Sequence, residues 1–91
     1  MNEFFFLCFL LLMEEEQKNL LDAFIIKAVK EMRVSRKISQ EDIAFHLGVT
    51  PSYIGQIESP KYRAKYNLYH LNSLAVLFDC SPKDFLPEKP L

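Results

Sequence analysis

The segment QEDIAFHLGVTPSYIGQIE, Gln40–Glu58, restricts most strongly what this chain can fold into. In each half, apolar residues recur every three or four positions, which is typical of a short amphipathic helix; they are Ile43, Ala44, Leu47, Ile54 and Ile57. Gly48 lies between the halves, and glycine adopts a positive φ at little steric cost, so it suits a tight turn between two helices. The small Ala44 lets the two helices cross closely.

Capping residues predict where these two helices begin and end. Ser39 followed by Asp42 forms a capping-box pattern, in which side chains bind otherwise unpaired amide groups. Thr50 followed by Pro51 is a start signal, because a proline at the first helical position loses no hydrogen bond. Pro60 should end this second helix, since the residue before a proline is pushed out of the helical conformation.

The flanking sequence predicts three more helices and no strand. A helix over residues 15–34 should bury an apolar stripe and expose a polar face; the stripe is Leu21, Phe24, Ile25, Ala28, Val29 and Met32, and the face is Lys27, Lys30, Glu31 and Arg33. After a surface loop at residues 59–66, a helix capped by Asn67 should direct its apolar residues inward, namely Leu68, Leu71, Leu74, Ala75 and Phe78. A last short helix is indicated by Ser81, Pro82 and Asp84, with Phe85 and Leu86 docked behind it. The predicted fold class is all-α, a compact domain of five short helices around one core.

The first residues differ in character from the rest of the chain. MNEFFFLCFLLL is apolar but much shorter than the roughly 20 residues of a membrane-spanning helix, so no membrane span is expected. It also lacks the basic flank and the small-residue cleavage site of a signal peptide. We expect an apolar extension over residues 1–14 and one domain over residues 15–91. The preferred hypothesis is a mis-assigned start, with translation beginning at Met13; the alternatives are a hydrophobic arm that pairs with another subunit and a membrane-surface anchor.

Composition and charge narrow the class of protein. A chain of 91 residues with 49% hydrophobic content and a net charge of −1 suits one small globular domain. Between Lys27 and Lys65 eight cations accompany four acids, so the middle of the chain is basic by +4. A phosphate-binding surface has this asymmetry, although a solvated charged face has it too. Cys8 and Cys80 match no metal-ligand spacing and are expected to be reduced cytosolic thiols.

The sequence contains no pattern of catalytic chemistry. His46 and His70 stand apart from cysteine and carboxylate ligand spacings, so no metal is expected. No nucleophile is paired with a base, and neither a phosphate-cradling glycine loop nor a paired-carboxylate site is found. We therefore expect a cytoplasmic protein that is not an enzyme and has no cofactor.

Val29–Leu86 resembles the lambda-repressor-like, Cro-type helix-turn-helix family, also called the xenobiotic-response-element family. The resemblance depends on Ser39-Gln40, Ala44, Gly48, Ile54, Ile57 and Glu58, and on LYHLNSLAVLFDCSPKDFL, which is similar to the family's closing two helices. It implies a sequence-specific transcription regulator, such as a repressor, that binds double-stranded DNA as a homodimer with the helix after Thr50 in the major groove. The implied dimer surface comprises residues 81–86 and the exposed side of the preceding helix.

The resemblance also implies roles for particular residues. The base-contact candidates are Pro51, Ser52 and Gln56, of which Gln56 is the strongest because its amide can form a bidentate pair with adenine. The phosphate-contact candidates are Gln40, Tyr53, Ser59, Lys61, Tyr62, Arg63 and Lys65. Three of these predictions have an alternative without DNA contact: Tyr53 packs with its hydroxyl at the surface, Gln56 faces solvent, and the loop cations form a solvated face. Glu58 is expected to bind a partner within the domain, since its charge repels phosphate.

Two positions depart from the family pattern. Lys37 stands where many members have glycine, so the preceding helix ends differently or Lys37 adopts a disfavoured backbone conformation. Ser59-Pro60 replaces the usual Asn-Gly, whose backbone N–H meets phosphate, and a proline cannot donate that bond. Either Ser59 or Lys61 takes over the contact, or the backbone clamp is weaker.

A function of another class stays open at this point. The chain could be an interaction module, such as an antitoxin that covers a toxin, or a repressor-like domain that has lost DNA binding. The loop at residues 59–66 and the helix after Thr50 distinguish these possibilities, because only a DNA-binding protein needs them to contact phosphates and bases.

Overall fold

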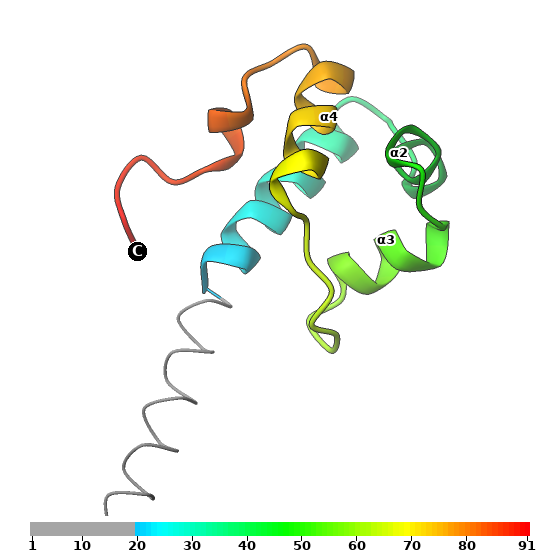
Figure 1. Cartoon of the computed structure of the whole chain (residues 1–91), viewed down its shortest axis with the longest axis horizontal. Helices are drawn as coiled ribbons and strands as arrows, with labels where there is room; N and C mark the ends of the chain where they lie inside the picture. Colours follow the sequence, from blue (N-terminus) through cyan, green and yellow to red (C-terminus); the bar gives the residue numbers. More distant parts are fainter. Residues whose placement is uncertain (1–19) are drawn as a thin grey trace, which may run out of the picture.

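The computed structural model describes residues 20–91. A helix over residues 20–35 is followed by α2 (Gln40–Leu47), α3 (Pro51–Glu58), α4 (Leu68–Phe78) and the 3-10 helix η1 (Pro82–Phe85) (Figure 1). This part of the chain has no strand, which confirms the all-α class. None of its helices is long and apolar enough to cross a membrane. The predicted start of the first helix, at residue 15, and the predicted apolar extension fall outside the described residues.

The predicted count of five helices needs one correction, at η1. The last element is a single 3-10 turn and not an α-helix. Ser81 caps it and Pro82 opens it, as expected, but Leu86 is already extended, with φ −103° and ψ 150°, before Pro87. Since the residue before a proline avoids the helical region, only four residues remain for the element, a length at which 3-10 helices are common.

The predicted starts of α2, α3 and α4 are confirmed. The Ser39 hydroxyl accepts from the Asp42 amide at 3.0 Å while the Asp42 carboxylate accepts from the Ser39 amide at 3.3 Å, so the capping box of α2 is complete. Thr50 caps α3, and Ser59 is extended where α3 ends, with φ −91° and ψ 131°. Asn67 caps α4 as expected.

Three helices end with the same arrangement of backbone hydrogen bonds. After the first helix, the amide of Ile38 donates to the carbonyl of Arg33 and that of Lys37 to the carbonyl of Val34, both at 3.0 Å. This is the Schellman pattern, which requires a left-handed residue at its centre. Lys37 has φ 58°, and Gly48 and Asp79 occupy the equivalent positions after α2 and α4 with φ 71° and 54°. Of the two expectations for Lys37, the disfavoured conformation is therefore the correct one.

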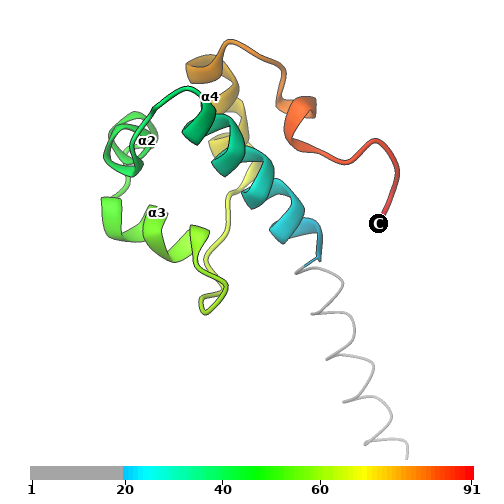
Figure 2. The ribbon, with the colours of Figure 1, turned by 180° about the vertical axis from the view of Figure 1, so that it is seen from behind.

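The core forms where the first helix, α2, α3 and α4 meet; its buried members include Ile25, Val29, Ile43, Ala44, Ile54, Ile57, Leu71, Leu74, Ala75 and Phe78. Figures 1 and 2 show α2 and α3 on one side of the pair formed by the first helix and α4, with η1 on the other. Phe85 of η1 is fully buried and packs edge to face on Phe78, with ring centroids 6.1 Å apart. The predicted core is thus correct at its centre.

At the ends of elements the predicted core is wrong. Leu68 is 78% exposed, and Leu21, Phe24 and Leu86 are exposed as well. Leu21 and Phe24 lie in the first described turns of the first helix, Leu68 at the first position of α4, and Leu86 directly after η1. Conversely, Tyr66 was expected in a surface loop and is only 7% exposed. Helical periodicity does not indicate where packing against another element stops.

Candidate nucleic-acid interface

The base-contact candidates lie on the open face of α3. Pro51, Ser52 and Gln56 are all exposed. Ser52 and Gln56 are four residues apart and therefore share one side of the helix. Ile54 and Ile57, on the opposite side, are 0% and 2% exposed and are packed in the core. The helix consequently presents a small polar surface whose orientation is set by the two buried isoleucines.

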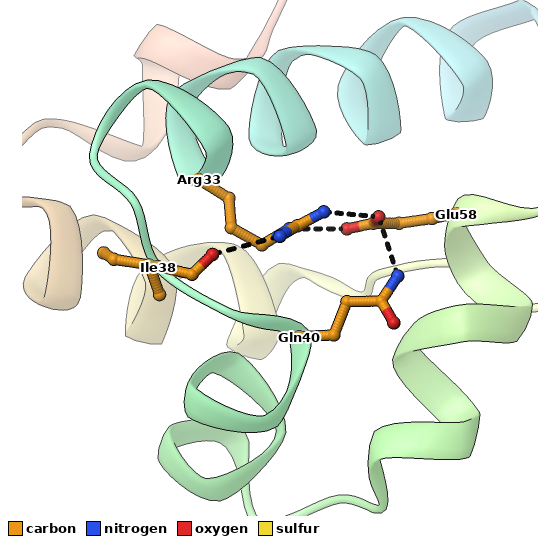
Figure 3. Close-up of polar contacts among 4 residues, drawn as sticks. All are labelled: Arg33, Ile38, Gln40 and Glu58. Carbon is orange, nitrogen blue, oxygen red and sulfur yellow. Dashed lines mark hydrogen bonds and ion pairs between the residues drawn. The ribbon is translucent and has the colours of Figure 1, made fainter.

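A partly buried hydrogen-bond network holds the end of α3 in place (Figure 3). Arg33 donates from Nε to Oε2 of Glu58 and from Nη2 to Oε1, both at 2.9 Å, and the two side chains are only 12% and 4% exposed. Nη1 of Arg33 also donates to the carbonyl of Ile38 at 3.0 Å. Nε2 of Gln40 donates to Oε1 of Glu58 at 3.1 Å. The bidentate, charge-assisted pair of Arg33 and Glu58 joins the first helix to the last residue of α3. The hydrogen bond from Gln40 adds the start of α2 to this network.

The prediction that Glu58 binds a partner within the domain is confirmed, whereas the placement of Arg33 on the polar face is wrong. Arg33 follows the buried Ile25 and Val29 at four-residue spacing, so it continues the buried stripe of the first helix. This four-residue spacing, together with the expectation that Glu58 binds a partner within the domain, indicated the pair in the sequence. Because Arg33 and Glu58 cancel, the excess of +4 over residues 27–65 remains for the other side chains.

Gln40 is a predicted phosphate contact that is partly committed to the fold. It is half-buried at the first position of α2, and one of its two amide hydrogens goes to Glu58. The second amide hydrogen is left for another acceptor. Gln40 also lies where the α2 macrodipole is positive, which favours an anion. The position therefore suits a phosphate contact that Glu58 orients.

Two backbone N–H groups of the loop after α3 bond within the loop. The hydroxyl of Ser59 accepts from the Lys61 amide at 3.3 Å, and the Ser59 carbonyl accepts from the Tyr62 amide at 3.4 Å. The N–H groups of Lys61 and Tyr62 are thus turned onto Ser59. The side chains of Lys61, Tyr62, Arg63 and Lys65 are all exposed.

The cations between residues 27 and 65 differ in their contacts. Arg36 donates to the carbonyl of Phe78 and lies over that ring, 5.5 Å from its centroid, so it fastens the first helix to α4. Nζ of Lys65 is 3.6 Å from Oδ2 of Asp22. Within residues 20–91, Lys30 and Lys61 have no ion-pair partner. Tyr53 is half-buried against the core, a position compatible with both of its expected roles.

Both histidines make structural hydrogen bonds. Nε2 of His46 donates to the Ser73 carbonyl at 2.9 Å, which links α2 to α4. Nδ1 of His70 accepts from the Asn67 amide at 3.2 Å and completes a capping box, a role that the sequence reasoning missed because that position usually holds an acid or an amide. No group of three or more His, Cys, Asp or Glu residues in the described part of the chain could hold a metal.

Cys80 is a half-buried free thiol in contact with the core. Its sulfur lies 3.9 Å from the sulfur of Met32. Burial, assisted by the negative charge of Asp84, raises the pKa of the Cys80 thiol above its usual value. A thiol with a raised pKa reacts slowly near neutral pH. Cys8 lies outside the described residues.

Comparison with known proteins agrees with this geometry. A family model described as a helix-turn-helix domain matches residues 26–88, which include α2, α3, α4 and η1. The chain is similar to the crystal structure of the restriction-modification controller protein C.AhdI from Aeromonas hydrophila, with 26% identity and a TM-score of 0.59 over 70% of this chain and 94% of that one. No curated protein matches the chain. The protein belongs to the helix-turn-helix domain family, and it is of the Cro and lambda-repressor type.

Proposed function

We propose that this protein is a sequence-specific transcription regulator that binds double-stranded DNA as a homodimer, with α3 in the major groove. The observation that carries the proposal is the open polar face of α3, where Ser52 and Gln56 are exposed while Ile54 and Ile57 are buried. A helix anchored in this way fits the major groove and can bring side chains to base edges. The likeness to a restriction-modification controller protein supports the same class of function.

Within this proposal, Gln56 reads adenine through its amide, Ser52 contacts a neighbouring base or phosphate, and Pro51 contacts a thymine methyl group or shapes the entry of the helix. The phosphate contacts come from Gln40, Tyr53, Ser59, Lys61, Tyr62, Arg63 and Lys65. Such a role needs neither a catalytic step nor a cofactor, and it places the protein in the cytoplasm with the DNA.

The dimer surface is assigned to the exposed side of α4 and to residues 81–86. Tyr69 and Val76 are 86% and 71% exposed and lie two turns apart on α4, so they share one side of the helix. Pairing two copies there brings two α3 helices to half-sites about one DNA turn, roughly 34 Å, apart. Sedimentation with and without DNA tests this assignment; a monomer at micromolar concentration in both conditions contradicts it.

DNA binding itself is tested by selecting bound sequences from random duplexes and measuring affinity against salt concentration. Lys61→Ala should weaken binding to all sequences and lower the slope of log affinity against log salt by about 1, because one phosphate contact is lost. Lys89→Ala is the matched control, since Lys89 is an exposed lysine outside both the proposed DNA contacts and the proposed dimer surface. An unchanged slope for Lys61→Ala contradicts the proposal.

Sequence reading is tested separately with Gln56→Ala. The loss of a bidentate amide should cost about 1–3 kcal/mol at one base pair and relax the preference there. The salt slope should stay as in the wild type, because no phosphate contact is removed. Equal losses on all sequences would assign Gln56 to the phosphates instead.

The second candidate is a protein-interaction module, for example an antitoxin or a repressor-like domain without DNA binding. Phe45 favours it, since this large aromatic residue on α2 is 90% exposed. A large exposed apolar side chain is typical of a protein contact. If neither Lys61→Ala nor Gln56→Ala alters DNA affinity, this reading replaces the first.

A further inference from the structure

A cavity of about 580 Å³ lies between the first helix and the loop that follows α3. Its apolar part is lined by Ala23 and Ile26 of the helix and by Ile57 and Ala64 from the other side. The volume lies within the range of roughly 300–1,000 Å³ that is usual for small-molecule sites. The cavity is separate from the exposed polar face of α3, and the proposed DNA contacts do not use its apolar part.

The charged lining of this cavity is predominantly cationic. It comprises five cations, Lys27, Lys30, Lys61, Arg63 and Lys65, and two acids, Asp22 and Glu58. Glu58 is already neutralised by Arg33, and Asp22 is 3.6 Å from Lys65. Lys30 and Lys61 come from the two walls, and neither has an ion-pair partner among residues 20–91. An anion that enters therefore meets uncompensated positive charge from both sides.

We infer that this cavity binds a small organic anion that carries an aromatic or other apolar body. The apolar lining removes the body from water, and the cations at positions 30 and 61 hold the anionic group. Tyr62, which also lines the cavity, adds an aromatic surface for a planar ligand. An inorganic anion gains only the second contribution, so an apolar body is part of the specificity.

Ligand binding at this position also affects the loop. Lys61, Arg63 and Lys65 line the cavity and belong to the proposed phosphate contacts. A ligand that draws these side chains inward removes them from DNA, and DNA in turn lowers ligand affinity by the same factor. This coupling rests on the proposed function, whereas the ligand site itself does not.

The site is tested by titrating the full chain with 8-anilinonaphthalene-1-sulfonate, an aromatic sulfonate whose fluorescence rises in apolar surroundings. Lys30→Glu should weaken binding about tenfold, because it places an acid beside the sulfonate. Lys89→Glu makes the same change in net charge outside both the cavity and the proposed dimer surface and should stay within about twofold of wild type. Inorganic phosphate at equal concentration should not displace the probe.

Other results overturn the inference. Unchanged affinity in Lys30→Glu, or equal weakening in both charge variants, means that the probe binds elsewhere or only through net charge. Displacement by phosphate means that the apolar lining plays no part. Circular dichroism confirms that each variant is folded.

DNA competition separates this inference from the proposed function. The probe should lower the affinity of the wild type for a labelled duplex and have about tenfold less effect on Lys30→Glu, since Lys30 is not a proposed DNA contact. Probe binding that depends on Lys30, in a protein that binds no DNA, leaves the ligand site standing and removes the proposed function. If the protein binds DNA but Lys30→Glu leaves the probe affinity unchanged, the proposed function stands and the ligand site is removed.

Discussion

Tyr66 has a buried hydroxyl group that forms no hydrogen bond within the described part of the chain. Its ring packs edge to face on His70, with centroids 6.1 Å apart. Burial, and secondarily the negative charge of Glu58, raises the pKa of Tyr66 well above its ordinary value. The hydroxyl was removed from water without a replacement partner, a loss that usually costs about 1–3 kcal/mol.

Tyr66→Phe should therefore raise the free energy of unfolding by about 1 kcal/mol at neutral pH, measured by urea denaturation. The pH dependence follows from the raised pKa: the neutral phenol is favoured in the folded state, so stability is lost as the pH rises above the unfolded value of about 10. The wild type should lose up to about 1.4 kcal/mol per pH unit there relative to Tyr66→Phe. Tyr62→Phe, at an exposed position outside the proposed dimer surface, is the control and should change little. A less stable Tyr66→Phe at neutral pH contradicts this account.

Lys37 carries a backbone conformation that suits glycine, with φ 58°. Lys37→Gly should raise the free energy of unfolding by about 1 kcal/mol, because a left-handed conformation is unfavourable for residues with a Cβ. Lys30→Gly, in the middle of the first helix, should lower it by about 1 kcal/mol. Thermal unfolding measures both changes. If the two glycine variants are both stabilised or both destabilised, backbone conformation does not decide the sign of the change in stability.

At the scale of an element, α3 contains a glycine that its conformation does not require. A Cβ at Gly55 would lie 3.9 Å from Oε1 of Gln40, which is an ordinary contact. Gly55→Ala should therefore raise the free energy of unfolding by about 0.5–1 kcal/mol, since glycine loses more conformational entropy in a helix than alanine. Chemical denaturation measures the change; a decrease would mean that the α2–α3 crossing tolerates no added methyl group.

Gly48 is the counterpart, where space is open but the backbone is restrictive. No atom lies within 4 Å of a Cβ built there, yet φ is 71°. Gly48→Ala should cost about 1–2 kcal/mol, because the left-handed conformation and not a steric contact disfavours alanine. An unchanged stability would mean that the turn after α2 relaxes to a different conformation.

At the scale of the whole molecule, the largely buried side chains of Arg33 and Glu58 connect the first helix to α3. Removing one partner leaves a buried charge unpaired, so Arg33→Met or Glu58→Gln should each cost about 3–5 kcal/mol. The double variant should cost less than the sum by more than about 1 kcal/mol, measured in a double-mutant cycle by urea unfolding. Lys27 and Glu31, an exposed pair 4.0 Å apart, form the control cycle and should couple by less than about 0.5 kcal/mol. Additive effects at Arg33 and Glu58 would contradict a shared network.

Most of the local structure could be predicted from the sequence. Capping boxes, the proline at the start of α3 and the left-handed turn at Gly48 involve residues within a few positions of one another, so their pattern is visible in the chain. Helical periodicity also identified Ile43, Ile54 and Ile57, because these side chains face inward under any arrangement of the helices. The same periodicity also predicted that the candidate base contacts are exposed, since Ser52 and Gln56 lie on the side of α3 opposite its apolar stripe.

The remaining features arise from contacts between distant parts of the chain. Arg33 and Glu58 are 25 residues apart, and the cationic cavity has walls from the first helix and from the loop after α3. Tyr66 is buried, and Leu68, two residues later, is exposed, because neighbouring elements cover one and not the other. Local propensity and spacing depend on a few adjacent residues, whereas burial and charge pairing depend on which surfaces meet. The chain's local chemistry therefore specified the helices and their turn, and the packing of those helices established the buried ion pair and the shape of the cavity.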